Sequence, residues 1–269
     1  MINFTKYHGC GNNFIIVRED DVRGYDYSQL ALDMCSVSTG IGADGLIVVR
    51  EEPALEMVFY NMDGSRAPMC GNGIRCFAAY CYDNGICRSK EYPVETLAGI
   101  MVVNVISTDP FMVRIDMGRP LFEPASFGVV DDADEFMSRT LHTTEGDFTV
   151  SSCFMGTVHT VVWVDKYPSE TAASQLSNHP VFTEKTNVNF VRYIDRSTLE
   201  IKTFERGVGF TCACGTGACA SLVMGIREGR TDRKVTVILP YGRLIIEQLD
   251  DGTVMMTGPA VRVAEGTYY

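Results

Sequence analysis

Short runs of apolar and β-branched residues recur along the chain and predict strands bounded by turn residues. The clearest are residues 14–20, 45–52 and 55–63, which are rich in Ile, Val and aromatic side chains. Residues 90–107 and 233–249 each contain two such runs joined at a glycine, which is typical of a β-hairpin. The pattern therefore predicts a protein built mainly of strands.

Two segments instead have the composition and spacing of helices. They run from Gly71 to about residue 82 and from Gly215 to about residue 228. Gly85 and Gly229 follow them at the place where a glycine commonly ends a helix. Two weaker helical patterns cover residues 27–36 and 169–177.

The chain repeats itself at a nearly constant interval. Cys-Gly-x-Gly occurs at Cys70 and again at Cys214, an offset of 144 residues. The pair Leu-Glu at 55–56 recurs with the same offset at 199–200, and Gly85 recurs as Gly229. Because strands and helices share this register, the sequence predicts two homologous halves.

These elements predict an α+β fold of two pseudo-symmetric domains. Each is expected to be an antiparallel, barrel-like sheet around one central helix. The expected domains are residues 1–118 and 119–260, and the last strand, 261–269, is a candidate to return to the first domain.

Composition narrows the classes of partner and site. The 269 residues carry a net charge of −11, which argues against nucleic acid and anionic membranes as partners. No leader-like segment or long apolar stretch is visible, so a cytoplasmic protein is expected. The ten cysteines show neither a CxxC spacing nor paired histidines, which predicts reduced thiols rather than a metal site.

A cysteine stands directly before each central helix, and this position indicates an anion-binding site with a reactive thiol. Backbone N–H groups and the helix dipole favour an anion at a helix start, and they also favour the thiolate form of a nearby cysteine. A carboxylate could then be held between the two helix starts. The residues expected to hold it are Gly71, Asn72, Gly215 and Thr216.

Two thiols on opposite faces of one carbon suit an epimerase or racemase. Cys70 or Cys214 removes the α-proton as a thiolate, and the other returns a proton from the far side, which inverts the carbon. Helix-start donors would stabilise charge that develops on the substrate carboxylate. No lysine stands out as a Schiff-base former for pyridoxal phosphate, so no cofactor is expected.

At these residues the chain resembles the cofactor-independent diaminopimelate epimerases over essentially its whole length. The matching segments are residues 8–14 (HGCGNNF), 40–46, 61–73 (NMDGSRAPMCGNG), 186–190 (TNVNF), 204–209 (FERGVG) and 213–219 (ACGTGAC). The resemblance implies an active site in the cleft between the two domains, with Cys70 and Cys214 as catalytic base and acid and without metal or pyridoxal phosphate. It also implies LL- or meso-diaminopimelate as substrate, a place in lysine biosynthesis, and an association into homodimers.

The resemblance assigns further site residues by position. His159 and Glu205 would assist the thiols or orient the substrate amino groups. Arg206 would form a bidentate bond with the distant carboxylate of the substrate. The other residues implied to grip the substrate are Asn12, Asn61 and Asn187.

Three departures from the family pattern leave the substrate open. Asn13 replaces an aspartate, Thr157 replaces an asparagine that binds the distal end, and Phe210 replaces a glutamate. These changes could suit a smaller or ring-bearing amino acid, so histidine racemisation is an alternative. A non-catalytic member that binds an amino acid is a second alternative. A proline or hydroxyproline epimerase ranks lower, because its usual histidine is Asn72 here.

Overall fold

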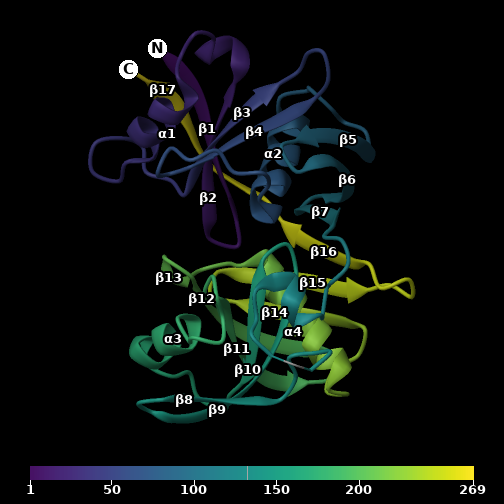
Figure 1. The fold of residues 1–269 in the computed structure, drawn as a ribbon. Coiled ribbons are helices and arrows are strands. Elements are labelled where there is room, and N and C mark those ends of the chain that lie inside the picture. The colour runs from purple at the N-terminus through teal and green to yellow at the C-terminus, as the bar shows by residue number, and fades with distance from the viewer. Residues whose placement is uncertain (132) are drawn as a thin grey trace. The chain divides into compact units, whose positions relative to one another are not determined.

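The computed structural model describes residues 1–131 and 133–269. These residues form two compact units. One unit comprises Met1–Ile115 and Thr257–Tyr269, and the other Asp116–Met256. The sequence placed the first boundary after residue 118 and the candidate return at residue 261. Figure 1 labels the helices and strands of the two units.

The first unit contains two helices among its strands, with a short 3-10 turn at Glu19–Val22. The elements, in chain order, are β1 (Ile2–Gly9), β2 (Asn12–Arg18), α1 (Tyr27–Cys35), β3 (Gly45–Arg50), β4 (Glu56–Asn61), α2 (Gly71–Asp83), β5 (Glu91–Thr96), β6 (Gly99–Thr108), β7 (Phe111–Asp116) and β17 (Val261–Tyr268).

The second unit has the corresponding elements, with a 3-10 turn at Pro124–Phe127. They are β8 (Arg139–Thr143), β9 (Gly146–Phe154), β10 (Val158–Trp163), α3 (Glu170–Ser177), β11 (Asn187–Asp195), β12 (Thr198–Glu205), β13 (Gly209–Thr211), α4 (Gly215–Arg227), β14 (Lys234–Leu239) and β15 (Gly242–Gln248). Strand β16 (Val254–Pro259) begins in this unit and passes into the first at Thr257. The predicted strands, hairpins and helices are all present.

Strand pairing repeats between the units. In the first, β1 pairs with β2, β3 with β4 and β5 with β6, all antiparallel. In the second, β9–β10, β11–β12 and β14–β15 repeat these pairings. Strand β17 pairs with β1 as β8 pairs with β9, so the C-terminal strand supplies the first unit with the strand that β8 supplies to the second. The repeat read from the sequence is therefore a repeat of structure.

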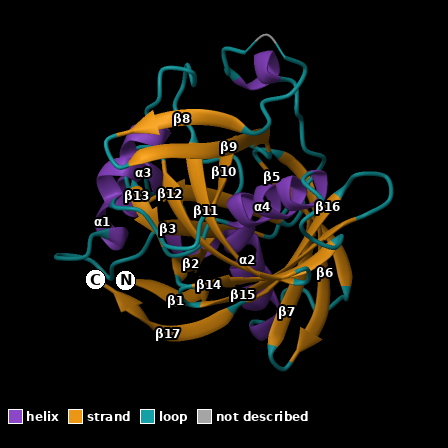
Figure 2. Ribbon diagram, turned by 90° about the horizontal axis from the view of Figure 1, so that it is seen from below, coloured by secondary structure: helices purple, strands orange, loops and turns teal. Residues whose placement is uncertain are grey.

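The sheets are mixed rather than antiparallel throughout, which corrects one detail of the expectation. Strands β2 and β3 run parallel, as do β10 and β11. The helix between the two strands, α1 or α3, carries the chain back to the starting edge, and such a crossover produces parallel neighbours. The α+β class holds, since strands dominate both units (Figure 2).

A buried helix lies at the centre of each unit. Every residue of α2 from Asn72 to Cys81 is buried, and so is every residue of α4 from Gly217 to Gly225. Helix α2 packs on β1, β2 and β6, and α4 packs on β9, β10 and β15. A helix that is apolar or small around its whole circumference needs such surroundings, and this packing fixes where each helix begins.

Candidate active site

Cys70 and Cys214 occupy the same structural position, the N-cap of a central helix. Both are extended, with φ −137° and ψ 121° at Cys70 and φ −115° and ψ 105° at Cys214. The first N–H groups of a helix have no partner within it, so each cysteine directly precedes backbone donors. The Cys214 side chain accepts one of them, from Gly217. Gly71, Asn72, Gly215 and Thr216 form the two first turns, as the sequence predicted.

A tight hairpin brings Asn12 to the start of α2. Strands β1 and β2 are joined by Cys10 and Gly11, both with positive φ (56° and 94°). Such a two-residue turn matches the twist of an antiparallel pair. The Asn12 side chain, at the beginning of β2, accepts a hydrogen bond from Asn72 Nδ2 at 3.1 Å, and its Oδ1 lies 3.7 Å from Cys70 Sγ.

Asn61 lies at the same end of the strands as Asn12, but its side chain hydrogen-bonds within the turn that follows β4. In the register of β2, β3 and β4, Phe14 is opposite Gly45 and Gly45 is opposite Asn61. Asn61 Nδ2 donates to Ser65 Oγ at 2.9 Å, and hydrogen bonds from Ser65 lower the pKa of Asp63. The structure therefore joins Asn12, Asn72 and Cys70 directly, and Asn61 through the strand order.

In the second unit, the Cys214 sulfur receives a backbone hydrogen bond. Gly217 N donates to Cys214 Sγ at 3.4 Å, and Thr216 Oγ1 lies 3.5 Å from the same sulfur. A Cβ on Gly217 would stand 2.2 Å from Asn189 Oδ1 and 3.2 Å from Cys214 Sγ. Only glycine permits this approach, which explains the second glycine of the Cys-Gly-Thr-Gly sequence.

His159 is buried in the second unit and neutral near pH 7. Burial lowers its pKa to about 3, and the charge of Arg206 acts in the same direction. Asn189 Nδ2 lies 3.2 Å from its Nδ1, while Asn189 Oδ1 accepts from Thr203. The amide NH2 therefore faces the ring, so Nδ1 is the acceptor and Nε2 carries the hydrogen. Nε2 has no hydrogen-bond partner among the described residues.

This burial predicts a pH dependence of stability. An unfolded histidine takes up its proton near pH 6.5, whereas folded His159 does so near pH 3, so the unfolded state holds more protons between these values. The free energy of unfolding should therefore fall on acidification below pH 6.5, by at most about 1.4 kcal/mol per pH unit from this residue. Urea unfolding from pH 7 to pH 5 measures the slope. His159→Gln should flatten it and the exposed-site control His142→Gln should not; equal slopes in all three proteins would contradict the assignment.

Arg206 is held beside His159 and Asn187. In the register of β10 and β11, His159 lies opposite Asn187, and the Asn187 Oδ1 accepts from the Arg206 backbone N–H at 2.9 Å. The guanidinium donates from Nη1 to the Glu184 carbonyl at 2.9 Å and from Nη2 to Thr157 Oγ1 at 3.1 Å. Four of the predicted residues are thus one cluster, in which Thr157 contacts the arginine.

Two departures from the family pattern have structural contacts of their own. The Phe210 ring packs on Phe190 and Phe204, with centroids 6.2 and 5.4 Å away, and the Lys202 ammonium lies 3.9 Å from its centroid. These rings belong to the hydrophobic core of the second unit. Asn13 donates from its side chain to Asp44 Oδ2 at 2.8 Å.

Glu205, the remaining predicted residue, ends strand β12. It lies opposite Gly209 of β13 and accepts a hydrogen bond from Thr211 Oγ1 at 2.6 Å. Three polar residues of the site were not singled out from the sequence. They are Asp44, which accepts from Asn13, Asn189, which lies beside His159, and Arg75, which donates to Asn72 Oδ1. Asp44 and Asn189 lie inside quoted motifs, at 40–46 and 186–190, which was the available signal.

Four of the other cysteines have environments that disfavour reactivity. Burial raises the pKa of Cys35 and Cys153 to about 12 and also raises the pKa of Cys76 and Cys81. Among the described residues there is no cluster of three or more His, Cys, Asp or Glu side chains placed to bind a metal. None of the helices described in the two units is long and apolar enough to cross a membrane.

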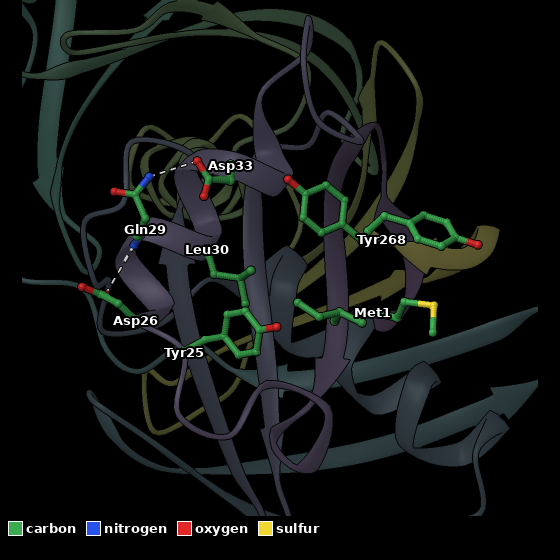
Figure 3. A pocket seen from close by; sticks show the side chains of 9 residues that line it. Met1, Tyr25, Asp26, Gln29, Leu30, Asp33 and Tyr268 are labelled. Atoms are coloured by element: carbon green, nitrogen blue, oxygen red, sulfur yellow. Dashed lines mark hydrogen bonds between the residues drawn. The ribbon is translucent and has the colours of Figure 1, made fainter.

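A separate cavity of about 210 Å³ lies in the first unit, where the two chain ends meet helix α1 (Figure 3). Its lining includes Met1, Tyr25 and Tyr268, and Gln29 is hydrogen-bonded to Asp33 at its rim. None of the predicted site residues lines this cavity.

Known proteins match this chain over most of its length. A family model described as diaminopimelate epimerase matches residues 4–123 and 151–263. The diaminopimelate epimerase of Pelotomaculum thermopropionicum is 38% identical, over 99% of both proteins. That of Desulfitobacterium hafniense is 40% identical, over 98% of this chain and 97% of the relative.

A solved structure shares the fold at much lower identity. A phenazine biosynthesis protein of the PhzF family from Bacillus anthracis aligns with a TM-score of 0.71 at 14% identity, covering 100% of this chain and 99% of that protein. At this identity the likeness shows a shared fold alone.

Proposed function

The chain belongs to the diaminopimelate epimerase family and is an isomerase; from this premise, we propose that it interconverts LL- and meso-diaminopimelate by a two-thiol mechanism without a cofactor. The observation that carries the proposal is the equivalent placement of Cys70 and Cys214 at two N-caps. A binding protein has no need of a thiol at both positions.

In this mechanism the two sulfurs act on opposite faces of one α-carbon. The thiolate takes the α-proton and becomes a thiol, and the electron pair left on carbon delocalises into the substrate carboxylate. The second thiol then gives its proton to the other face and becomes a thiolate, so one proton enters for each that leaves. Donors at the helix starts stabilise the charge that develops on the carboxylate.

Arg206 supports a substrate with a second, distant carboxylate. A guanidinium has five N–H donors in a plane, and the bonds to Glu184 and Thr157 use two of them. These bonds fix its plane, which favours bidentate binding of a carboxylate. Thr157 thereby acts through the arginine, where the family has an asparagine that binds substrate. His159 is neutral near pH 7 and offers its Nε2 N–H as a hydrogen-bond donor.

The contacts of Asn13 and Phe210 weaken the case for a ring-bearing substrate. The ring-bearing alternative treated both changes as alterations of the surface that contacts the substrate. Asn13 is bonded to Asp44, and Phe210 is packed on two core phenylalanines. Histidine racemisation therefore loses two of the three departures that favoured it, and diaminopimelate remains the proposed substrate.

Incubation with single amino acids in deuterated water tests the proposal. We expect α-deuterium to enter diaminopimelate, with conversion between its LL and meso forms, and not to enter histidine or proline. Uptake into histidine alone would replace the proposed substrate. No uptake into any amino acid, together with measurable binding of diaminopimelate, would support the non-catalytic alternative.

A further inference from the structure

We propose that Asp44 and Arg75 are positioning residues, which orient two side-chain amides so that Asn12 presents its carbonyl oxygen to the Cys70 thiol. The inference extends the proposed function, because it takes Cys70 as one of the two catalytic thiols. It assigns the resting protonation of the pair: Cys70 as the thiol and Cys214 as the thiolate.

Asp44 fixes the orientation from one end. Its Oδ2 accepts three hydrogen bonds: from Asn12 Nδ2 at 2.9 Å, from the Asn13 backbone N–H at 2.7 Å and from Asn13 Nδ2 at 2.8 Å. A carboxylate can only accept, so the NH2 group of Asn12 must face Asp44. The Asn12 oxygen then points the other way, toward the start of α2.

Arg75 fixes the same orientation from the other end. Its buried guanidinium donates from Nη2 to Asn72 Oδ1 at 2.8 Å and from Nη1 to the Gly71 carbonyl at 2.9 Å. A guanidinium can only donate, so the Asn72 oxygen faces Arg75 and the Asn72 NH2 faces Asn12. A Cβ at Gly9 would stand 2.8 Å from Arg75 Nη2, so glycine there makes room for the arginine.

Asp44 and Arg75 therefore impose the same orientation on the two amides, because the first can only accept and the second can only donate. The group 3.7 Å from Cys70 Sγ is a carbonyl oxygen, which accepts from a thiol and repels a thiolate. The Cys214 sulfur instead accepts the Gly217 N–H, which favours its thiolate. Two opposite charges belong to the same network: Arg75 is bonded to the Gly71 carbonyl, next to Cys70, and Asp44 to the amide of Asn12. A nearby cation favours a thiolate and a carboxylate opposes it. Burial keeps the neighbouring Cys76 thiol neutral. The Asn12 carbonyl, like the Asp44 carboxylate, disfavours the thiolate form of Cys70.

Alkylation of the free enzyme by iodoacetamide tests the network without requiring turnover. Trypsin releases Cys70 alone in peptide 67–75 and Cys214 in peptide 207–227, where fragment spectra separate it from Cys212 and Cys219. We measure the labelling rate of both cysteines against pH, in the unmodified protein, in Asp44→Ala and in Asp44→Asn. The variant Asp26→Asn, which keeps a good N-cap of α1, is the matched control.

Asp44→Ala removes the acceptor that orients Asn12, and we expect Cys70 to be labelled about fivefold faster near neutral pH, with its rate profile moved to lower pH. Asp44→Asn can place one oxygen where Oδ2 receives all three bonds but carries no charge, so its Cys70 rate should lie between those of the unmodified protein and the alanine variant. Cys214 labelling should stay unchanged in both variants. Should Asp44→Ala fail to fold, Asp44→Ser replaces it, since its hydroxyl is one bond too short to reach Asn12.

The proposal is overturned by an unchanged Cys70 rate in the alanine or serine variant. It is also overturned if Asp44→Asn behaves like that variant, or if Cys214 changes in parallel. A Cys70 profile that lies at lower pH than the Cys214 profile in the unmodified protein would contradict the resting assignment. Because labelling needs no substrate, these results stand whether or not diaminopimelate is turned over.

Discussion

Replacing Cys70 or Cys214 by alanine is expected to lower kcat about a thousandfold or more. Each thiol has a separate task in the proposed mechanism, and a positioned acid or base contributes about 10²–10⁴ to the rate. The loss should be equally severe for either cysteine, because one turnover uses both. Initial rates of LL to meso conversion, and of the reverse, measure it.

A half-buried thiol elsewhere tests whether the effect is specific to the two N-cap cysteines. Cys87→Ala removes a half-buried cysteine after α2 that belongs to neither N-cap, and its kcat should stay within about twofold of the unmodified enzyme. Circular dichroism melts confirm that all three variants fold. Substantial turnover in either N-cap variant would mean that the corresponding sulfur is not part of the chemistry.

Replacing Arg206 by glutamine is expected to lower kcat/KM for diaminopimelate about a hundredfold. The change removes a charged, fixed guanidinium, and hydrogen bonds to a charged group contribute about 1.5–3 kcal/mol each. The loss should fall mainly on KM, because the distant carboxylate does not take part in the proton transfers. Steady-state kinetics in both directions separates KM from kcat.

The control for Arg206 is a surface arginine of the same unit. Arg119 is paired with Asp251 on the surface, and Arg119→Gln should leave the kinetics unchanged. An unaltered KM in Arg206→Gln would show that the arginine does not hold the second carboxylate, and would reopen the choice of substrate.

The repeat made most of the fold predictable. Equal spacing of strands, hairpins and the Cys-Gly sequence at an offset near 144 residues indicated two similar units, and the central helices begin at the predicted glycines, Gly71 and Gly215. The parallel pairs β2–β3 and β10–β11 escaped prediction, since an apolar run looks alike in either direction. The helices at 27–36 and 169–177 carried the missing information, because each separates two strands that become neighbours.

The sequence predicted the reactive cysteines of the site better than it predicted the side-chain contacts around them. Cys70 and Cys214 followed from their place before the helices, while Thr157 and Phe210 were interpreted from the sequence as substrate contacts. In the structure Thr157 accepts from Arg206, and the Phe210 ring lies on Phe190. Such contacts join segments that are far apart along the chain, so residue spacing gives no access to them. The homodimer and the cytoplasmic location stay predictions.

The distribution of deuterium in the first turnover tests the central claim most directly. LL-diaminopimelate is incubated in deuterated water, and product and recovered substrate are analysed while conversion is still small. If two thiols serve opposite faces, the meso product carries one α-deuterium and the recovered LL form carries almost none. Equal labelling of both forms from the start would mean that one base serves both faces, and would contradict the account.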